Sequence, residues 1–544
     1  MSSALAEASD QIAPSGFLSR ERTVARAGFN RWLVPPCALA IHLCIGMAYG
    51  FSVFWLPLTH ALSGGAAACG TDVGLMQALT TTSCEWRVSD LIVVYELFFV
   101  FLGSSAALFG GWLERAGPRK AGLVSALCWC GGLVISAFGV MTHQLWMMWL
   151  GSGVIGGVGL GLGYISPVST LIKWFPDRRG MATGMAIMGF GGGALVGAPL
   201  ADLLMNHFRG PGQVGVWQAF LVMAAIYAVF MVAGSLGYRV PPHEWRPEGW
   251  TAPVSTRSLV SQHNVALSDA TRTPQFWLIW LVLCLNVTAG IGVISVASPM
   301  LQEIFGGSLI GQAGVKIGAL TDDQRRAVAA VAAGFTGLIS LFNIGGRFFW
   351  ASYSDRIGRK LTYATFFVLG FAMYTAAPLL ARAGMQGLFV AAICIILSMY
   401  GGGFATVPAY LADIFGTRFV GAIHGRLLTA WSVAGVAGPF LISYLRDAEL
   451  TAGVPRAAVY DATLYILAGL LVAGFLCNLA VRPVASRWWM RDDPAPVVAS
   501  ADGASYGIGR GGLTMAGLLA WACVGIPIAW GVSVTLGKAL VLFS

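Results

Sequence analysis

Twelve apolar segments, each long enough to cross a lipid bilayer, constrain this sequence more than any other feature. A transmembrane helix needs roughly 20 consecutive apolar residues. The segments cover residues 32–58, 89–112, 121–141, 144–171, 181–206, 215–238, 275–302, 327–353, 361–381, 386–411, 419–445 and 460–481. Only 10% of the residues are charged and 57% are hydrophobic, whereas a soluble protein carries about 25% charged residues. We therefore expect an all-α integral membrane protein.

The distribution of Lys and Arg predicts the orientation in the membrane. Residues 1–31 are polar, and the apolar segment that follows is too long for a signal-peptide core of about 7–15 residues. With the N-terminus in the cytoplasm, the inner segments hold 22 Lys and Arg and the outer loops hold 8. This is the bias of the positive-inside rule. It accounts for the net charge of +9, so nucleic acid is not an expected partner.

The central polar loop divides the twelve segments six and six. A thirteenth apolar segment, about 512–537, follows a second polar stretch. We predict these regions: 1–31, a cytoplasmic tail; 32–238, an N-terminal six-helix half; 239–274, a cytoplasmic loop; 275–482, a C-terminal six-helix half; 483–511, a cytoplasmic linker; and 512–544, an extra transmembrane segment.

The two halves share an internal repeat. A charged turn, GGWLERAGPRK, follows the second segment, and a similar turn, ASYSDRIGRK, follows the eighth. The offset from Glu114 to Asp355 is 241 residues, and the same offset relates further landmarks in the two halves. These landmarks are Pro167 and Pro408, Gly180 and Gly421, and Gly184 and Gly425. A common offset indicates that one six-helix unit has been duplicated.

The two charged turns resemble the signature loop of the major facilitator superfamily. Longer stretches resemble its oxalate/formate antiporter family: YGFSVFWLPL (49–58), GLGYISPVSTLIKWFPDRRGMATG (161–184), TPQFW (273–277) and FGTRFVGAIHGRLLTAWSVAGVAGP (415–439). The resemblance covers about residues 30–482. It implies a 12-helix transporter whose halves rock around a central site. It also implies inner gates at Glu114, Arg115, Asp355 and Arg356, although a solvated turn would carry the same charges. Glu114 stands where the family usually has Asp.

Arg347 is the main candidate for a substrate-binding residue. It lies eight residues before Asp355, or about 12 Å along a helix, and so near the middle of the membrane. Ionisable groups at that depth usually face a cavity or a partner, and the guanidinium fork suits a carboxylate. In the resembling family, an arginine at this position contacts the carboxylate substrate. The alternative is a structural arginine, but acids are few in the predicted spans, and Glu96 is the one farthest from a span end.

The resembling family has a second cation, a lysine, in its eleventh helix, and this sequence has Trp431 there. One cation beside an indole suits a monocarboxylate better than a dicarboxylate. Arg426 lies nearby and either replaces the missing charge or extends to the inner interface, which we favour. The resemblance also implies that aromatic residues line the cavity, although aromatic residues in membrane helices more often serve packing. These residues are Tyr49, Tyr164, Tyr400 and Phe404.

The sequence leaves open whether carboxylate transport is driven by exchange for another anion or by symport with a proton. Exchange needs no titratable group, whereas Glu96 and His42 are the candidates to carry a proton. Each is equally expected as an ordinary hydrogen-bonded residue. In the long first outer loop, Cys69 and Cys84 would form a disulfide if the loop faces an oxidising periplasm.

No motif predicts an enzyme, a metal site or a nucleotide site, and no cofactor is expected. The chain is therefore expected to be a monomeric secondary transporter of small carboxylate anions in a bacterial inner membrane, with the lipid bilayer and, in the case of symport, protons as its other partners. Two alternatives stay open. One is an exporter of larger amphiphiles, for which Arg347 would be structural. The other is a membrane sensor of carboxylates that does not transport them.

Overall fold

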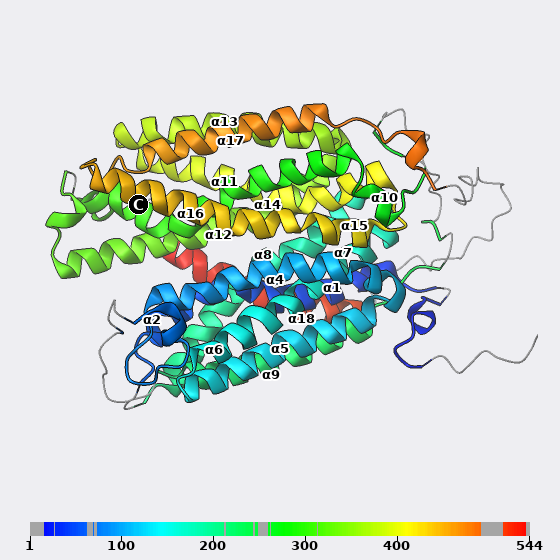
Figure 1. The fold of residues 1–544 in the computed structure, drawn as a ribbon, viewed down its shortest axis with the longest axis horizontal. Helices are drawn as coiled ribbons and strands as arrows, with labels where there is room; N and C mark the ends of the chain where they lie inside the picture. The colour runs from blue at the N-terminus through cyan, green and yellow to red at the C-terminus, as the bar shows by residue number, and fades with distance from the viewer. Residues whose placement is uncertain are drawn as a thin grey trace, which may run out of the picture.

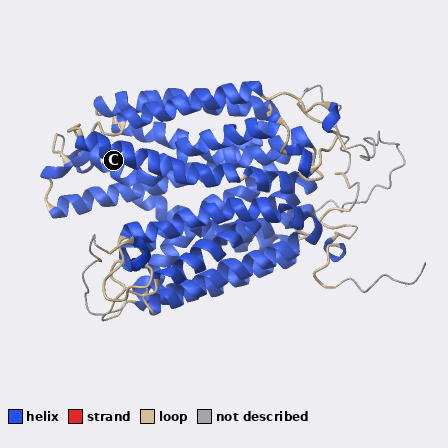
Figure 2. Cartoon of the chain, in the orientation of Figure 1, coloured by secondary structure: helices blue, strands red, loops and turns tan. Residues whose placement is uncertain are grey.

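A computed structural model describes residues 16–26, 28–62, 69, 73–210, 214–242, 245–247, 259–261, 263–312, 314–490 and 515–539. Over these ranges the regular structure is helical and there are no strands (Figures 1 and 2). Twelve of the helices in the described residues are long and apolar enough to cross a membrane. They comprise eleven of the twelve predicted segments and the thirteenth, residues 515–537, whereas the eighth predicted segment is helical but is not among them. The chain is thus a multi-pass membrane protein.

The N-terminal half contains helices α1 to α9, which lie along one side of the molecule (Figure 1). Its elements are α1 (Val34–Ile45), the 3-10 segment η4 (Gly46–Phe54), α2 (Trp55–Leu58), α3 (Leu75–Ala78), α4 (Val88–Ala116), α5 (Pro118–Met141), α6 (Leu145–Met148), the π-helical η5 (Trp149–Gly156), α7 (Gly157–Trp174), α8 (Arg179–Phe208) and α9 (Val216–Gly237). The first predicted span is therefore three joined pieces, because the backbone tightens into a 3-10 helix at Gly46.

The C-terminal half contains helices α10 to α17 on the other side (Figure 1). Its elements are α10 (Leu267–Ala270), α11 (Pro274–Phe305), α12 (Asp322–Ile357), α13 (Arg359–Arg382), α14 (Gln386–Phe415), α15 (Val420–Leu427), α16 (Thr429–Thr451) and α17 (Asp461–Ala480). Helix α11 continues past the predicted end at residue 302, and α12 begins five residues before the predicted start. The added turn of α12 (322–326) is polar, and the added residues of α11 begin with Glu303, so hydropathy alone places both boundaries too early or too late.

Glycines in the left-handed region end α4 and α12 at equivalent positions. Gly117 has φ +85° and Gly358 has φ +91°, and the next helix starts at the following residue in both cases. A residue with a Cβ rarely adopts this conformation. The two charged turns of the repeat are therefore tight corners at one end of the bundle, which we call the gate end.

Helix α18 (Met515–Ala539) corresponds to the thirteenth apolar segment. It packs against α12 of the C-terminal half and against α8 and α1 of the N-terminal half. Two other predicted regions fall largely outside the described residues: the start of the tail (1–15) and most of the linker (491–514).

Candidate functional site

At the gate end, Asp355 joins the two halves. Its carboxylate accepts hydrogen bonds from the backbone amides of Gly180 (2.8 Å) and Met181 (2.9 Å), which belong to the first turn of α8. A helix N-terminus favours an anion because its amides are unpaired and its dipole is positive there. Asp355 therefore latches α12 to α8, and Arg359 adds an ion pair to it at 2.6 Å.

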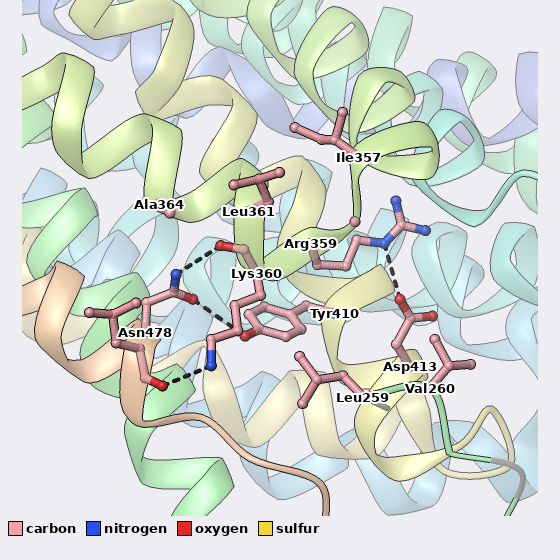
Figure 3. A pocket seen from close by; sticks show the side chains of 12 residues that line it. Leu259, Val260, Ile357, Arg359, Lys360, Leu361, Ala364, Tyr410, Asp413 and Asn478 are labelled. Atoms are coloured by element: carbon pink, nitrogen blue, oxygen red, sulfur yellow. Dashed lines mark hydrogen bonds and ion pairs between the residues drawn. The ribbon is translucent and has the colours of Figure 1, made fainter. Parts of the chain in front are cut away.

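Asp413 of α14 extends this latch. It pairs with Arg359 at 3.3 Å and with Arg179, at the start of α8, at 3.2 Å. Figure 3 shows Arg359 directed at Asp413 on the wall of a cavity of about 550 Å³. The same cavity is lined by Tyr410 and Asn478, and Leu259 and Val260 of the central loop also contribute to it. The second charged turn is thus part of a network of two acids and two arginines that joins the halves.

Glu114, in the first charged turn, has a different set of contacts. Its Oε2 pairs with Lys173 at 2.7 Å, whereas its Oε1 has no hydrogen-bond partner. A Cβ built on Gly421 would lie 2.7 Å from that Oε1, so Glu114 lies beside the start of α15. The other two predicted gate residues, Arg115 and Arg356, have exposed side chains at the same end.

Arg347 is completely buried in α12 (0% exposed). Its Nε donates to Asn343 Oδ1 at 3.0 Å and its Nη1 donates to the carbonyl of Ile187, in α8, at 3.3 Å. Its Nη2 has no hydrogen-bond partner, and no ion pair among the described residues includes it. A buried cation without a counter-charge is costly, so this guanidinium has unused capacity for an anion.

The five predicted aromatic residues gather around Arg347 from both halves. The guanidinium carbon lies 5.9 Å from the Tyr49 ring and 5.5 Å from the Phe404 ring. Tyr49 and Tyr400 share a hydrogen bond of 3.2 Å between their hydroxyls. Trp431 lies 4.3 Å from Phe404 and 5.4 Å from Tyr164. We call Arg347 and these five residues the central cluster.

Two further donors in the central cluster lack an acceptor. Besides Arg347 Nη2, the buried Tyr164 hydroxyl and the Trp431 indole Nε1 have no hydrogen-bond partner. Buried donors are almost always bonded in folded proteins, because an unmade bond costs about 1–3 kcal/mol. The cluster is therefore rich in donors and short of acceptors, and a carboxylate supplies only acceptors.

The sequence reasoning missed Asn343 and Phe190. Asn343 lies one helical turn before Arg347, and its i, i+4 spacing could have identified it as the arginine's partner. Phe190 contacts Tyr49, Tyr164 and Trp431 at ring distances of 5.0, 5.4 and 5.4 Å. No local pattern marks Phe190, because its partners come from three other helices.

The remaining candidates lie in different surroundings. His42 is buried in α1, where its ring nitrogens face the carbonyls of Ala186 and Tyr164. Glu96 is exposed on α4. Arg426 donates to Leu267 O at 3.0 Å, so it reaches α10 and not the central cluster.

The end opposite the gate end contains the Cys69–Cys84 disulfide, with a Cα–Cα distance of 4.9 Å. Beside it, His143 stacks on Trp86 at 4.1 Å, and its Nε2 lies 3.0 Å from the Cys84 carbonyl. Burial lowers the pKa of His143, which the Cys84 carbonyl and the charge of Glu85 partly offset. The loop that contains the disulfide is therefore tied to the start of the fourth predicted span.

Glu303 is a buried acid of α11 that the predicted spans did not include. It lies in the last turn of α11 and pairs with Arg446 of α16 at 2.5 Å, and it also accepts from the Tyr460 hydroxyl at 2.6 Å. The predicted span ended one residue before it. In the described residues no group of three or more His, Cys, Asp or Glu is arranged to hold a metal ion.

Comparisons with known proteins identify relatives over most of the chain. The sequence model of the Major Facilitator Superfamily matches residues 39–439. An uncharacterized MFS-type transporter YhjX of Escherichia coli (strain K12) is 23% identical over 75% of this chain and 86% of its own. An oxalate:formate antiporter of Oxalobacter formigenes is 26% identical over 75% of this chain and 83% of its own.

The apicoplast pyruvate carrier 1 of Toxoplasma gondii is 27% identical over 62% of this chain and 66% of its own. Among solved structures, the MFS transporter FucP in the outward conformation has a TM-score of 0.55 at 13% identity. That match covers 84% of this chain and all of FucP. The structural likeness shows the fold alone.

Proposed function

Because this chain belongs to the Major Facilitator Superfamily, whose members are secondary transporters, we propose that it carries small monocarboxylate anions across a bacterial inner membrane. In this proposal a monomer exposes the central cluster alternately to the two sides as its halves rock. The gate end faces the cytoplasm.

One observation carries the proposal: Arg347 is a fully buried cation with an unpartnered Nη2 and no acid in contact. A structural arginine would use all of its donors on protein acceptors, whereas Nη2 of Arg347 has no hydrogen-bond partner. Its neighbours Tyr164 and Trp431 add two more unused donors. A carboxylate has two oxygens and one negative charge, which match this set.

The surroundings favour one carboxylate per substrate. Arg347 is the only Lys or Arg of the central cluster, and Arg426 is turned toward α10. A dicarboxylate would place its second charge against Trp431 and Phe404, which offer one indole donor and apolar ring faces. The cost of desolvating a second charge therefore selects against it.

The names of several relatives agree with a small carboxylate. They are an oxalate:formate antiporter and a pyruvate carrier, and also monocarboxylate transporter 13 of Bos taurus, which is 27% identical over 35% of this chain and 37% of its own. We assign the inner gates to Glu114, Arg115, Asp355 and Arg356. Of these, Asp355 has the direct bonds between the halves.

The test is uptake into proteoliposomes of labelled formate, pyruvate, lactate and oxalate against internal unlabelled substrate. We expect a monocarboxylate to exchange faster than oxalate. Arg347→Gln should reduce exchange by at least about 30-fold, the scale of losing one partner of a buried charge pair. Arg347→Lys should restore only part of the rate, because an ammonium lacks the planar fork.

Arg426→Gln is the matched control, since it removes an arginine that contacts only the gate-end segment 267–271. It should leave exchange within about threefold of the wild type. Exchange that survives Arg347→Gln would overturn the assignment of the site. Export of a lipophilic dye without uptake of any carboxylate would favour the amphiphile exporter instead.

A further inference from the structure

His42 lies in the last turn of α1, just before the 3-10 segment η4. It is fully buried (0% exposed), and both of its ring nitrogens face backbone carbonyls. Nδ1 faces the backbone carbonyl oxygen of Ala186, in α8, and Nε2 lies 3.2 Å from the backbone carbonyl oxygen of Tyr164, in α7. Pro167 has no N–H to offer the Gly163 carbonyl, and this carbonyl is a further polar neighbour of His42.

This arrangement matches a protonated imidazole. A carbonyl oxygen only accepts hydrogen bonds, and a neutral imidazole carries one N–H, so one of its nitrogens would direct a lone pair at an oxygen. The imidazolium form has two N–H groups and satisfies both carbonyls. Burial away from water opposes the charge. The two carbonyls favour the protonated ring and burial opposes it, so the charges nearby decide whether His42 holds a proton.

Arg347 contributes to that field. The His42 ring lies 6.4 Å from the Phe190 ring, and the Arg347 guanidinium carbon lies 6.0 Å from the same ring. The two basic groups thus contact one aromatic side chain in a membrane interior, where charges are poorly screened. An unpaired Arg347 disfavours a proton on His42, and an anion on Arg347 removes that repulsion.

Other ionisable groups near α1 do not offer a negative charge to His42. His424 of α15 is also buried, and its ring lies 5.9 Å from that of Tyr164. The remaining ionisable groups on described elements packed against α1 are Arg31 (η3), Tyr49 (η4), Arg119, Lys120, Cys128 and Cys130 (α5), Tyr164 and Lys173 (α7), Arg179, Asp202 and His207 (α8), Tyr227 (α9) and Cys523 (α18). Asp202 is the only acid among them, and it is exposed near the far end of α8.

We propose that His42 is the proton site of this transporter, and that one proton moves with each monocarboxylate. The inference rests on the proposed function. The unprotonated ring nitrogen of His42 binds the proton when the central cluster is open to one side of the membrane. It releases the proton when the cluster is open to the other side, and the substrate stays a carboxylate throughout. Binding is reciprocal: the anion favours the proton, and the proton supplies the second positive charge that the central cluster otherwise lacks.

The experiment uses the full-length protein in proteoliposomes, with labelled pyruvate as the substrate and pyranine inside as the pH probe. Protein-free vesicles measure the leak of neutral pyruvic acid. For the wild type we expect an acid-outside gradient to drive accumulation of at least about tenfold over the no-gradient level, with acidification of the interior. Exchange at equal pH should also be faster at low pH than at high pH.

His42→Gln should abolish gradient-driven accumulation and pyruvate-dependent acidification. Its exchange rate should stay at the high-pH rate of the wild type at every pH. His42→Lys, which places a fixed cation against the carbonyls, should also exchange without being driven by the gradient. His424→Gln is the matched control, since it removes a second buried histidine, and it should keep the gradient-driven accumulation.

Two results would overturn the inference. One is wild-type exchange that moves no protons. The other is gradient-driven accumulation that survives in His42→Gln or is lost only in His424→Gln. Both differ from failure of the proposed function, in which the wild type would exchange no carboxylate at any pH. If both His42 variants fail to fold, the pyranine signal of the wild type still decides whether protons move.

Discussion

The two charged turns at the gate end come from one repeated motif, yet they hold the halves together in different ways. Asp355 accepts two backbone hydrogen bonds from α8 and pairs with Arg359. Glu114, at the equivalent position, pairs with Lys173 of its own half, and its second oxygen has no partner. One turn therefore bridges the halves by direct bonds, and the other mainly braces its own half.

The repeat offset of 241 residues identifies the substitutions behind this difference. Arg359 corresponds to Pro118, and Asp413 corresponds to Ile172. The N-terminal turn thus lacks both the arginine and the second acid of the Asp355 network. The extra methylene of Glu114 also changes where its carboxylate lies relative to the facing helix. A duplicated turn can therefore keep its backbone corner while losing its charge network.

The largest expected effect comes from removing the charge of each turn. Asp355→Asn should lower the free energy of unfolding by about 2–4 kcal/mol, because it weakens two amide hydrogen bonds at a helix N-terminus and leaves Arg359 with one acid. Glu114→Gln should cost about 1 kcal/mol or less, as for an ion pair near the surface. Thermal unfolding of the purified variants in detergent measures both. Equal losses would show that the two turns are equivalent after all.

A methyl group added at the facing helix ends should have a smaller and still unequal effect. A Cβ at Gly180 would lie 2.1 Å from the Ala351 carbonyl oxygen, which is backbone, whereas a Cβ at Gly421 would meet side-chain atoms at 2.7 Å. Gly180→Ala should therefore destabilise by about 1–3 kcal/mol, and Gly421→Ala by less, because side chains yield more easily than helices. A larger effect at Gly421 would contradict the difference in packing between the two turns.

The smallest effect is expected from restoring the missing arginine. Pro118→Arg places a guanidinium where Arg359 stands in the other turn, so it should couple to Glu114 by about 0.5 kcal/mol. Loss of the proline's stiffness in the unfolded chain offsets this by a similar amount. A double-mutant cycle with Glu114→Gln isolates the coupling from that offset. Zero coupling would mean that the corner geometry, and not the missing charge, sets the two turns apart.

Much of the fold could be predicted from the sequence, because each helix of about 20 apolar residues is a local signal. The charged turns likewise fall at the predicted corners, and Arg347 lies in the predicted helix with the five aromatic residues around it. The roles of these residues stay predictions.

The contacts that close the gate end could not be predicted. Asp413 and Arg179 are 234 residues apart, and Asp355 meets amides 174 and 175 residues away. No periodicity encodes such pairs, because they depend on how two complete halves meet. Glu303 was missed for another reason: hydropathy places the end of a span where apolar residues stop, whereas α11 continues through a buried ion pair.

Helix α18 has a consequence for the lipid around the protein. A Cβ at Gly531 would lie 2.6 Å from the Leu195 carbonyl oxygen of α8, and a Cβ at Gly337 of α12 would lie 2.6 Å from the Thr535 methyl. The helix thus covers the line where α8 and α12 meet. Lipid tails are as apolar as the exposed face of α18, so the hydrophobic effect does not hold the helix in place, and its close packing against α8 and α12 does. If α8 and α12 separate on that side, as the proposed transport cycle requires, α18 cannot keep its contacts with both, and it would still separate part of that line from the acyl chains.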